Sequence, residues 1–253
     1  MFRLARVLDL LQYRCRYPHL LFEREDYVRP DGKPPATLSP SVYYTIKQLG
    51  SFYCADHLLQ RGPCRMLEVG AGFNQYFPRR FGSEYEYWMV DQAGFYNQDH
   101  FDKARKLRRE HTFVNGLVSD FSPELPDGHF DVTFSISVLE HVPYGEIAKC
   151  AEDMFRITKP GGISVHSIDV TPETTKTRGV RWLESFQAAG FEIDPEISLV
   201  WSFETPPYEK ELLLEPLQSV YEAFGGAEAK KFDKPVIRPY YFSTILAHCR
   251  RPS

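Results

Sequence analysis

The chain has 253 residues, 43% of them hydrophobic and 25% charged, and a formal net charge of -4. This length predicts one α/β domain with additions, and the slight acidity argues against nucleic acid or an anionic membrane surface as the main partner. No apolar stretch is long enough to span a bilayer. Five scattered cysteines without a CxxC pair predict free thiols in a reducing cytoplasm, with no disulfide or metal framework.

The first quarter of the chain, residues 1–62, is predicted to be a helical cap. Residues 1–28 have a helical pattern, and the basic, amphipathic segment from Phe2 to Arg16 is expected to pack on its own domain, with weak membrane-surface docking as the alternative. An uninterrupted apolar segment typical of a signal peptide is absent there. Turn residues predict a loop over 29–35, and apolar residues every three or four positions predict a helix over 40–60.

The stretch from Arg65 to Asn74 predicts a strand, a glycine turn and the start of a helix. Its apolar run ends abruptly at Gly70, as in a buried parallel strand that enters a tight turn. Gly70 and Gly72 allow positive φ and a close approach of the backbone to a ligand. Residues 74–81 can begin a helix whose free N–H groups attract a carboxylate or phosphate. The pattern therefore predicts a nucleotide-like ligand over the turn.

A second strand is predicted over residues 85–91, and it ends in an acid. Asp91 lies 23 positions after Glu68. An acid at the end of the second strand of a βαβ unit lies beside the first turn, where it can accept hydrogen bonds from ribose hydroxyls. The alternatives are a helix N-cap or a solvated loop acid.

The rest of the chain alternates between helical and strand patterns. Expected strands cover 111–116, 130–139, 163–170, 192–203 and 240–248, and expected helices cover 98–110, 144–157 and 180–189, the last with Gly190 as its C-cap. Residues 204–239 form an insertion with a helical middle over 212–224. This order predicts an α/β fold: a Rossmann-like, seven-stranded, mostly parallel sheet with helices on both faces.

Five segments together resemble the class I S-adenosylmethionine-dependent methyltransferases, specifically the type 11 small-molecule branch. They occur in family order with family spacing: Leu67–Gly72, Val90–Asp91, Leu125–Val132, Ser137–Val142 and Lys159–Gly162. The resemblance implies an enzyme that uses S-adenosyl-L-methionine. It also implies a single methyltransferase domain over 1–253, with a core formed by 63–203 and 240–253.

The resemblance implies a role for ten residues at the cofactor. Glu68, Gly70, Ala71 and Gly72 would line its methionine end, Asp91 with Gln92 would take the ribose hydroxyls, Ser119 and Asp120 would approach the adenine, and Ser137 and Val138 would pass beside the methionine moiety. The chain departs from the family pattern in two places. Asn74 stands where many members have a third glycine, and 115–120 replaces the usual Gly-Asp pair.

The main alternative is a nicotinamide-binding Rossmann domain. Its GxGxxG motif requires a final glycine where this chain has Gln75. Glu68 would also face a pyrophosphate in that domain, whereas S-adenosylmethionine offers an ammonium group. The pattern therefore favours the methyltransferase.

Three residues are candidates for catalysis: His141 after the fourth strand, and His166 with Asp169 at the end of the fifth. A histidine is suited to accept a proton from a sugar hydroxyl. His141 belongs to a motif shared across many acceptors, so a structural or cofactor-side role is at least an equal alternative. His166 is the favoured base, because it belongs to the more substrate-specific half of the sheet. His166 and Asp169 are three apart, and both face one site only if the strand ends between them.

The methyl acceptor is predicted from one further likeness. The run His166–Asp169 resembles bacterial methyltransferases of surface-polysaccharide synthesis, which implies O-methylation of a sugar or glycan. A lipid or quinone-like acceptor is the next hypothesis. A third is a regulatory module that binds the cofactor without turnover. The oligomeric state is left open.

Overall fold

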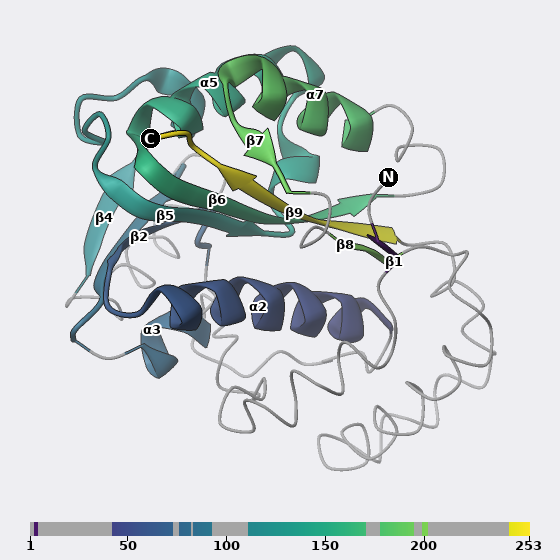
Figure 1. The fold of residues 1–253 in the computed structure, drawn as a ribbon, viewed down its shortest axis with the longest axis horizontal. Coiled ribbons are helices and arrows are strands. Elements are labelled where there is room, and N and C mark those ends of the chain that lie inside the picture. The colour runs from purple at the N-terminus through teal and green to yellow at the C-terminus, as the bar shows by residue number, and fades with distance from the viewer. Residues whose placement is uncertain are drawn as a thin grey trace.

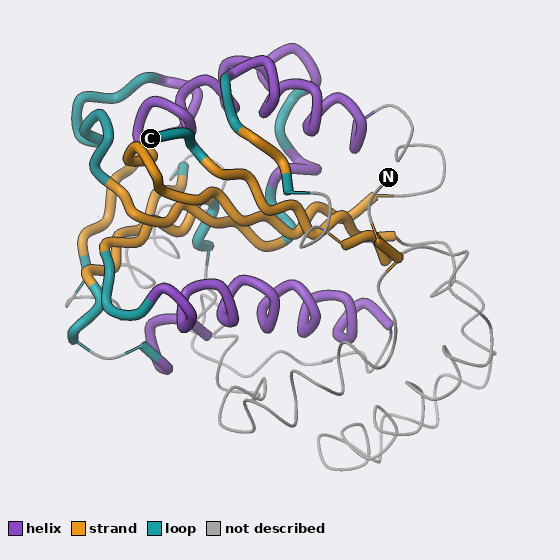
Figure 2. The backbone as a smooth tube through the Cα atoms, viewed as in Figure 1, coloured by secondary structure: helices purple, strands orange, loops and turns teal. Residues whose placement is uncertain are grey.

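The structure is a computed structural model that describes residues 3–4, 42–72, 76–81, 83–92, 111–170, 178–194, 199–201 and 243–253. These residues form one open sheet with helices on both faces (Figures 1 and 2). The fold class predicted from the sequence is confirmed. The predicted helices over 98–110 and 212–224, and the insertion as a whole, lie outside the described residues.

The sheet has a parallel centre whose strands follow the predicted ones closely. β2 (Arg65–Val69), β3 (Glu86–Asp91), β4 (Thr112–Asn115), β5 (Phe130–Ile136) and β6 (Thr158–Val170) are mutually parallel where they pair. Their apolar residues are buried on both faces, as parallel strands covered by helices require. The full order is β1-β8-β9-β6-β5-β2-β3-β4, with β7 paired to β9.

The other edge of the sheet differs from the prediction. The expected strand 192–203 is divided into β7 (Glu192–Ile193) and β8 (Leu199–Trp201), and both pair antiparallel with β9 (Ser243–Arg250). Residues 195–198, which separate β7 from β8 in the sequence, lie outside the described residues. A further strand, β1 (Arg3–Leu4), pairs with β8. The helix prediction is therefore wrong at these two residues, and the described sheet has nine strands instead of seven.

The helices cover the two faces of the sheet unequally. α2 (Val42–Arg61) packs on one face, and α5 (Ile147–Ile157) and α7 (Val180–Ala189) pack on the other (Figure 1). The short α3 (Tyr76–Arg80) follows the glycine turn. α2 confirms the helix predicted over 40–60. Because its buried residues belong to the sheet's own core, this part of the expected cap is a core helix.

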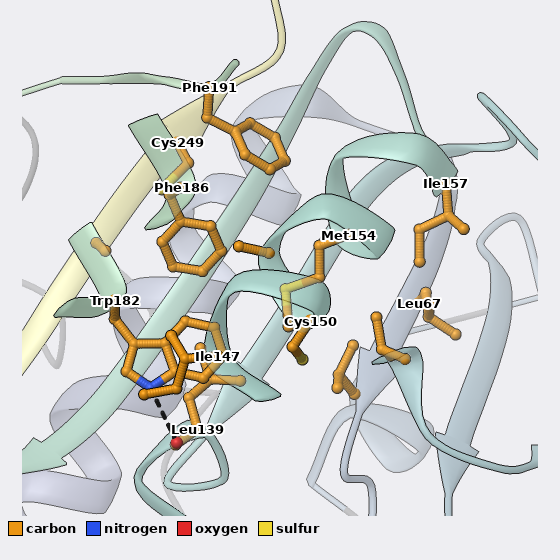
Figure 3. Packing of buried hydrophobic residues seen from close by; sticks show 14 of the residues in the cluster. Leu67, Leu139, Ile147, Cys150, Met154, Ile157, Trp182, Phe186, Phe191 and Cys249 are labelled. Atoms are coloured by element: carbon orange, nitrogen blue, oxygen red, sulfur yellow. Dashed lines mark hydrogen bonds between the residues drawn. The ribbon is translucent and has the colours of Figure 1, made fainter. Parts of the chain in front are cut away.

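Two hydrophobic clusters hold these layers together. One lies between α2 and the sheet and includes Phe52, Tyr53, Leu58 and Phe134. The other lies between the sheet and the helices α5 and α7 (Figure 3). Side chains along β6 alternate between the two, as strand geometry requires. The chain leaves α7 through Gly190, which adopts the predicted left-handed C-cap with φ +109°.

The strand order reverses at β2, which has β3 on one side and β5 on the other. In open α/β sheets, ligands bind outside the carboxyl ends of the strands at such a switch point. The turns after β2 and β5 meet here, so the fold places the glycine turn and the segment Ser137–Val142 beside each other.

Candidate functional site

The turn after β2 needs glycine for two separate reasons. Gly70 and Gly72 have φ values of +68° and +48°, a region that side chains with a Cβ enter only at a cost. A Cβ added to Gly70 would also lie 2.3 Å from Cγ1 of Val138. The predicted positive φ is confirmed. The group that approaches Gly70 in this structure is the Val138 side chain, so the two turns are in direct contact.

Asp91, at the end of β3, is fixed against the same turn. Its Oδ2 accepts a hydrogen bond from Gly72 N at 2.6 Å, and its Oδ1 accepts one from Gln92 N at 2.7 Å. The carboxylate thus bridges the ends of β2 and β3. A carboxylate oxygen accepts more than one hydrogen bond, so these contacts orient Asp91 and are compatible with ribose hydroxyls as further donors.

Glu68 lies under the turn and is almost fully buried. It shares the α2 side of the sheet with Tyr87, whose hydroxyl donates a hydrogen bond to Glu68 Oε2. Burial and the neighbouring Glu68 charge raise the pKa of the Cys54 thiol on α2. Ala71 is also buried, so the described turn presents mainly backbone to a ligand.

The segment after β4 lies next to Asp91. Gly116 N donates a hydrogen bond to the Asp91 carbonyl at 3.1 Å. Ser119 and Asp120 belong to the 3-10 helix η4 (Val118–Asp120), and Asp120 Oδ2 accepts a hydrogen bond from Leu117 N. Leu117, two residues after the end of β4, and Phe121 are exposed apolar side chains of this segment. Sequence reasoning missed Leu117, although an apolar residue just after Asn115-Gly116 was a usable signal.

A buried ion pair anchors the loop that follows. Asp153 on α5 is buried, its Oδ1 lies 2.7 Å from Arg156 Nη2, and its Oδ2 accepts a hydrogen bond from Phe121 N at 3.1 Å. Arg156 also donates to the carbonyls of Ser122 and Leu125. Burial raises the pKa of Asp153, although the bonds to Arg156 oppose that shift. The pair thereby fixes the loop from residue 121 to 125 onto α5.

Ser137 is the most constrained residue at the end of β5. It has φ +53°, which is uncommon for a residue other than glycine, and its N–H donates to the Ser167 carbonyl at 2.8 Å. Only 8% of its surface is exposed, and its Oγ has no hydrogen-bond partner within the described part of the chain. Strained residues and unsatisfied buried hydroxyls are features of functional sites.

His141 lies in the next turn and faces solvent. It ends the 3-10 helix η5 (Leu139–His141), its side chain is 70% exposed, and its Nε2 lies 3.7 Å from Glu140 Oε1. The backbone N–H of His141 donates a hydrogen bond to the carbonyl of Val138, the residue that contacts Gly70. The structure thus brings His141 to the same edge of the sheet as the glycine turn.

His166 has a different environment from the one predicted. Its ring is fully buried, Nδ1 lies 2.8 Å from Ser135 Oγ, and Nε2 lies 2.7 Å from Ser164 Oγ. The ring stacks on Phe186 of α7 with centroids 5.0 Å apart, and burial lowers the histidine pKa to about 3. A ring with both nitrogens bonded and no solvent access is not placed to take a proton from an acceptor, so the structure argues against His166 as the base.

Asp169 does not join His166. β6 continues to Val170, so the strand does not end between them. His166 contacts α7 on one face, whereas Ser167 lies against Gly50 of α2 on the other, and alternation places Asp169 on the side of Ser167. His166 and Asp169 therefore face opposite sides of the sheet and do not share one site.

With this geometry established, comparison with known proteins identifies the family. Residues 67–166 match the family described as "Methyltransferase domain". The chain carries a methyltransferase domain over these residues. This match covers the glycine turn, Asp91 and the turn after β5, so it decides against the nicotinamide-binding alternative. Its cofactor is S-adenosyl-L-methionine. No curated protein sequence matches this methyltransferase.

Solved structures agree with the methyltransferase fold. One described as the [4+2]-cyclase SpnF has a TM-score of 0.57 at 20% identity, with 99% of this chain and 98% of that chain covered. Phosphoethanolamine N-methyltransferase 2 of Haemonchus contortus, in complex with S-adenosyl-L-methionine, has a TM-score of 0.55 at 17% identity, with 98% and 57% covered. At these identities the likeness shows the fold alone.

The described residues fit S-adenosylmethionine. The glycine turn presents backbone, the Asp91 carboxylate is oriented beside it, and the buried Ser137 hydroxyl would gain a partner from a ligand at this edge. Within the same residues, no three His, Cys, Asp or Glu side chains are grouped to hold a metal ion. Nor does any helix in the described portion of the chain have the length and apolar character needed to cross a membrane.

Proposed function

We propose that this methyltransferase methylates a hydroxyl group of a sugar or surface-polysaccharide acceptor, with His141 as the general base. The observation that carries the proposal is the position of His141. Its side chain is exposed on the turn after β5. Its backbone N–H donates a hydrogen bond to the carbonyl of Val138, whose side chain contacts the glycine turn. An exposed imidazole is open to an acceptor and to water, which must finally receive the proton.

The choice of His141 over His166 rests on their surroundings. His166 is held in the core by two serine hydroxyls and its pKa is lowered to about 3 by burial, so it stays neutral and enclosed. His141 is largely solvated, and its Nε2 lies 3.7 Å from Glu140 Oε1. Asp169, on the α2 side of β6, is left as a candidate for contact with the acceptor.

The residues at the switch point would have separate roles in cofactor binding and proton transfer. The bound cofactor supplies a methyl group that is already activated by its sulfonium. Asp91 would bind the ribose of the cofactor and Ser137 its methionine end. Glu68, below the glycine turn, would line the methionine end. Orientation of this kind contributes about 7–11 kcal/mol in favourable cases, and a general base adds about 10²–10⁴-fold.

The sugar acceptor is supported by the run His166–Asp169, which resembles bacterial methyltransferases of surface-polysaccharide synthesis. On this proposal the enzyme works in the cytoplasm, with weak contact to a membrane surface where a lipid-linked glycan is the substrate. A lipid or quinone-like acceptor and a cofactor-binding regulatory module are the competing outcomes of the test below. The Haemonchus protein, by its name, acts on phosphoethanolamine.

The test incubates the purified chain with methyl-labelled cofactor and separate sets of nucleotide sugars, glycolipids and quinones. Labelled product from the sugars or glycolipids, detected by mass spectrometry on an oxygen atom, is the expected result. Product from quinones alone would replace the sugar acceptor, and cofactor binding without product from any set would favour the regulatory module.

The base is tested in the same assay with His141→Gln. Loss of about 10²–10⁴-fold in turnover is expected, with the affinity for S-adenosylhomocysteine unchanged. His129→Gln is the matched control, because His129 precedes β5 at the opposite edge of the sheet. Turnover of His141→Gln equal to that of the control would refute the assignment.

A further inference from the structure

The turn that carries His141 is held by Arg178, two residues before α7, and by Trp182 in the first turn of that helix. Arg178 Nη1 donates hydrogen bonds to the carbonyl of Glu140, at 2.9 Å, and to the carbonyl of Val142. These two carbonyls belong to the residues immediately before and after His141. The Arg178 guanidinium therefore fixes the backbone on both sides of the candidate base without contacting the imidazole in any described interaction.

A side chain of α7 itself supports the turn one residue earlier. Trp182 is fully buried, and its Nε1 donates a hydrogen bond to the Leu139 carbonyl at 3.0 Å (Figure 3). Its ring packs against that of Phe186, with ring centroids 5.3 Å apart, and the Phe186 ring stacks on His166. α7 is thus attached to β6 through buried rings, which gives Arg178 a rigid base from which to hold the turn.

The other end of the turn requires such support. Ser137 has a positive φ that costs on the order of 1–2 kcal/mol relative to an ordinary backbone conformation. Such a conformation persists only where the surrounding structure determines it strongly. Between Ser137 and His141, Val138 packs against Gly70 and residues 139–141 form the short helix η5. Arg178 and Trp182 add three hydrogen bonds to backbone carbonyls of this turn.

We propose that Arg178 is a positioning residue for His141. It sets the place of the imidazole relative to the acceptor and has little part in holding the cofactor, since Asp91 and the glycine turn are fixed by their own bonds. This inference rests on the proposed role of His141. A misplacement of about 1 Å in a catalytic group costs up to roughly 100-fold in rate, so the expected effect is large.

Two substitutions separate the charge of Arg178 from its geometry. Arg178→Met removes both hydrogen bonds. Arg178→Lys keeps the charge but loses the planar, fixed N–H directions of a guanidinium. Arg181→Met is the matched control, because Arg181 lies in α7 itself and no described hydrogen bond joins it to the turn. With saturating cofactor and acceptor, Arg178→Met should lose roughly 10–100-fold in kcat, Arg178→Lys less, and Arg181→Met almost nothing.

The affinity for S-adenosylhomocysteine, measured by calorimetry, distinguishes positioning from general damage. It should change by no more than about twofold in Arg178→Met, since an interaction that acts in the chemical step lowers kcat and leaves cofactor binding alone. A parallel loss of affinity and kcat in both Arg178 variants would mean that the residue supports the fold as a whole, and it would overturn the proposal.

Hydrogen exchange keeps the test independent of the acceptor. The His141 and Val142 amides donate to the carbonyls of Val138 and Leu139. In Arg178→Met these amides should exchange faster, while α5 and the central strands keep wild-type rates. Unchanged exchange in the turn would refute the proposal, even where no acceptor has been found. If exchange rises and His141→Gln keeps full turnover, the base assignment fails, and the holding of the turn by Arg178 stands.

Discussion

Gly70→Ala tests the claim that two turns meet at the switch point. The alanine Cβ would lie 2.3 Å from Cγ1 and 2.6 Å from Cγ2 of Val138, and 3.0 Å from its Cβ. Rotation of the valine about χ1 moves the two methyl groups but leaves its Cβ in place, so it cannot clear the contact completely. The substitution also forces a residue with a Cβ to keep φ near +68°.

The two costs can be separated within this chain. A positive φ costs alanine about 1–2 kcal/mol, and the overlap with Val138 adds about 1–3 kcal/mol of overpacking strain. Gly62→Ala isolates the first cost, because Gly62 has φ +76° and nothing within 4 Å of the added Cβ. Gly70→Ala should therefore lower the free energy of unfolding by about 2–5 kcal/mol, and Gly62→Ala by about 1–2 kcal/mol.

Urea unfolding of four proteins measures the difference: wild type, Gly70→Ala, Val138→Ala and the double variant. Val138→Ala removes both methyl groups but keeps the Cβ at 3.0 Å, so in that background Gly70→Ala should lose most of its overlap strain. The lost strain, about 1–3 kcal/mol, is the coupling energy between the two positions. Binding of S-adenosylhomocysteine should weaken in Gly70→Ala. A coupling energy near zero would refute the reasoning, since Gly70 would then matter for its φ alone.

Three further predictions follow from single residues. Asp91→Ala should lose most of the rise in Tm that S-adenosylhomocysteine gives the wild type; a full rise would remove Asp91 from the cofactor site. Ser137→Gly should be more stable than Ser137→Ala by about 1–2 kcal/mol in urea unfolding, because both lose the hydroxyl but only glycine tolerates φ +53°; equal stability would contradict the strain. His166 has a folded pKa of about 3, below the ordinary 6.5 expected in the unfolded chain, so the unfolded chain binds the proton first and stability is lost as pH falls through that window. His166→Gln should remove roughly 1 kcal/mol per pH unit from this acid dependence, and an unchanged slope would show that His166 is not buried and neutral.

Local chemistry made the cofactor side of the site predictable. Gly70 and Gly72 were identified because few other residues adopt positive φ, and Asp91 because a strand end at that spacing lies beside the first turn. The segment after β4 was less predictable. Asp120 was expected to approach the adenine, but the structure shows that its carboxylate also accepts a hydrogen bond from Leu117 N, and that Leu117 is an exposed apolar side chain two residues after the strand end.

The catalytic residues were harder to predict because their surroundings come from distant regions of the chain. The length of β6 beyond His166 depends on pairing with β9, where Val170 lies opposite Ser243. That pairing fixes Asp169 on the opposite face, and no local pattern contains it. The burial of His166 was indicated in the sequence by Ser164, two residues before it, and by Ser135 on the neighbouring predicted strand, since small polar residues on core strands need a hydrogen-bond partner. Its other neighbour, Phe186, comes from α7.

The position of β9 has a consequence for how the protein is made. Residues 243–250 are the last strand in the sequence, yet β9 lies inside the sheet, between β6 and β8, and its side chains enter both hydrophobic clusters. Among the described strands, β9 joins β8 and β1 to the parallel centre, and without residues 243–250 this edge of β6 would be unpaired. The sheet therefore closes only after residues 243–250 have been synthesised, and the exposed edge of β6 is open to aggregation until then. A chain truncated before Ser243 would lack the side chains that β9 contributes to both hydrophobic clusters, so we expect it not to fold.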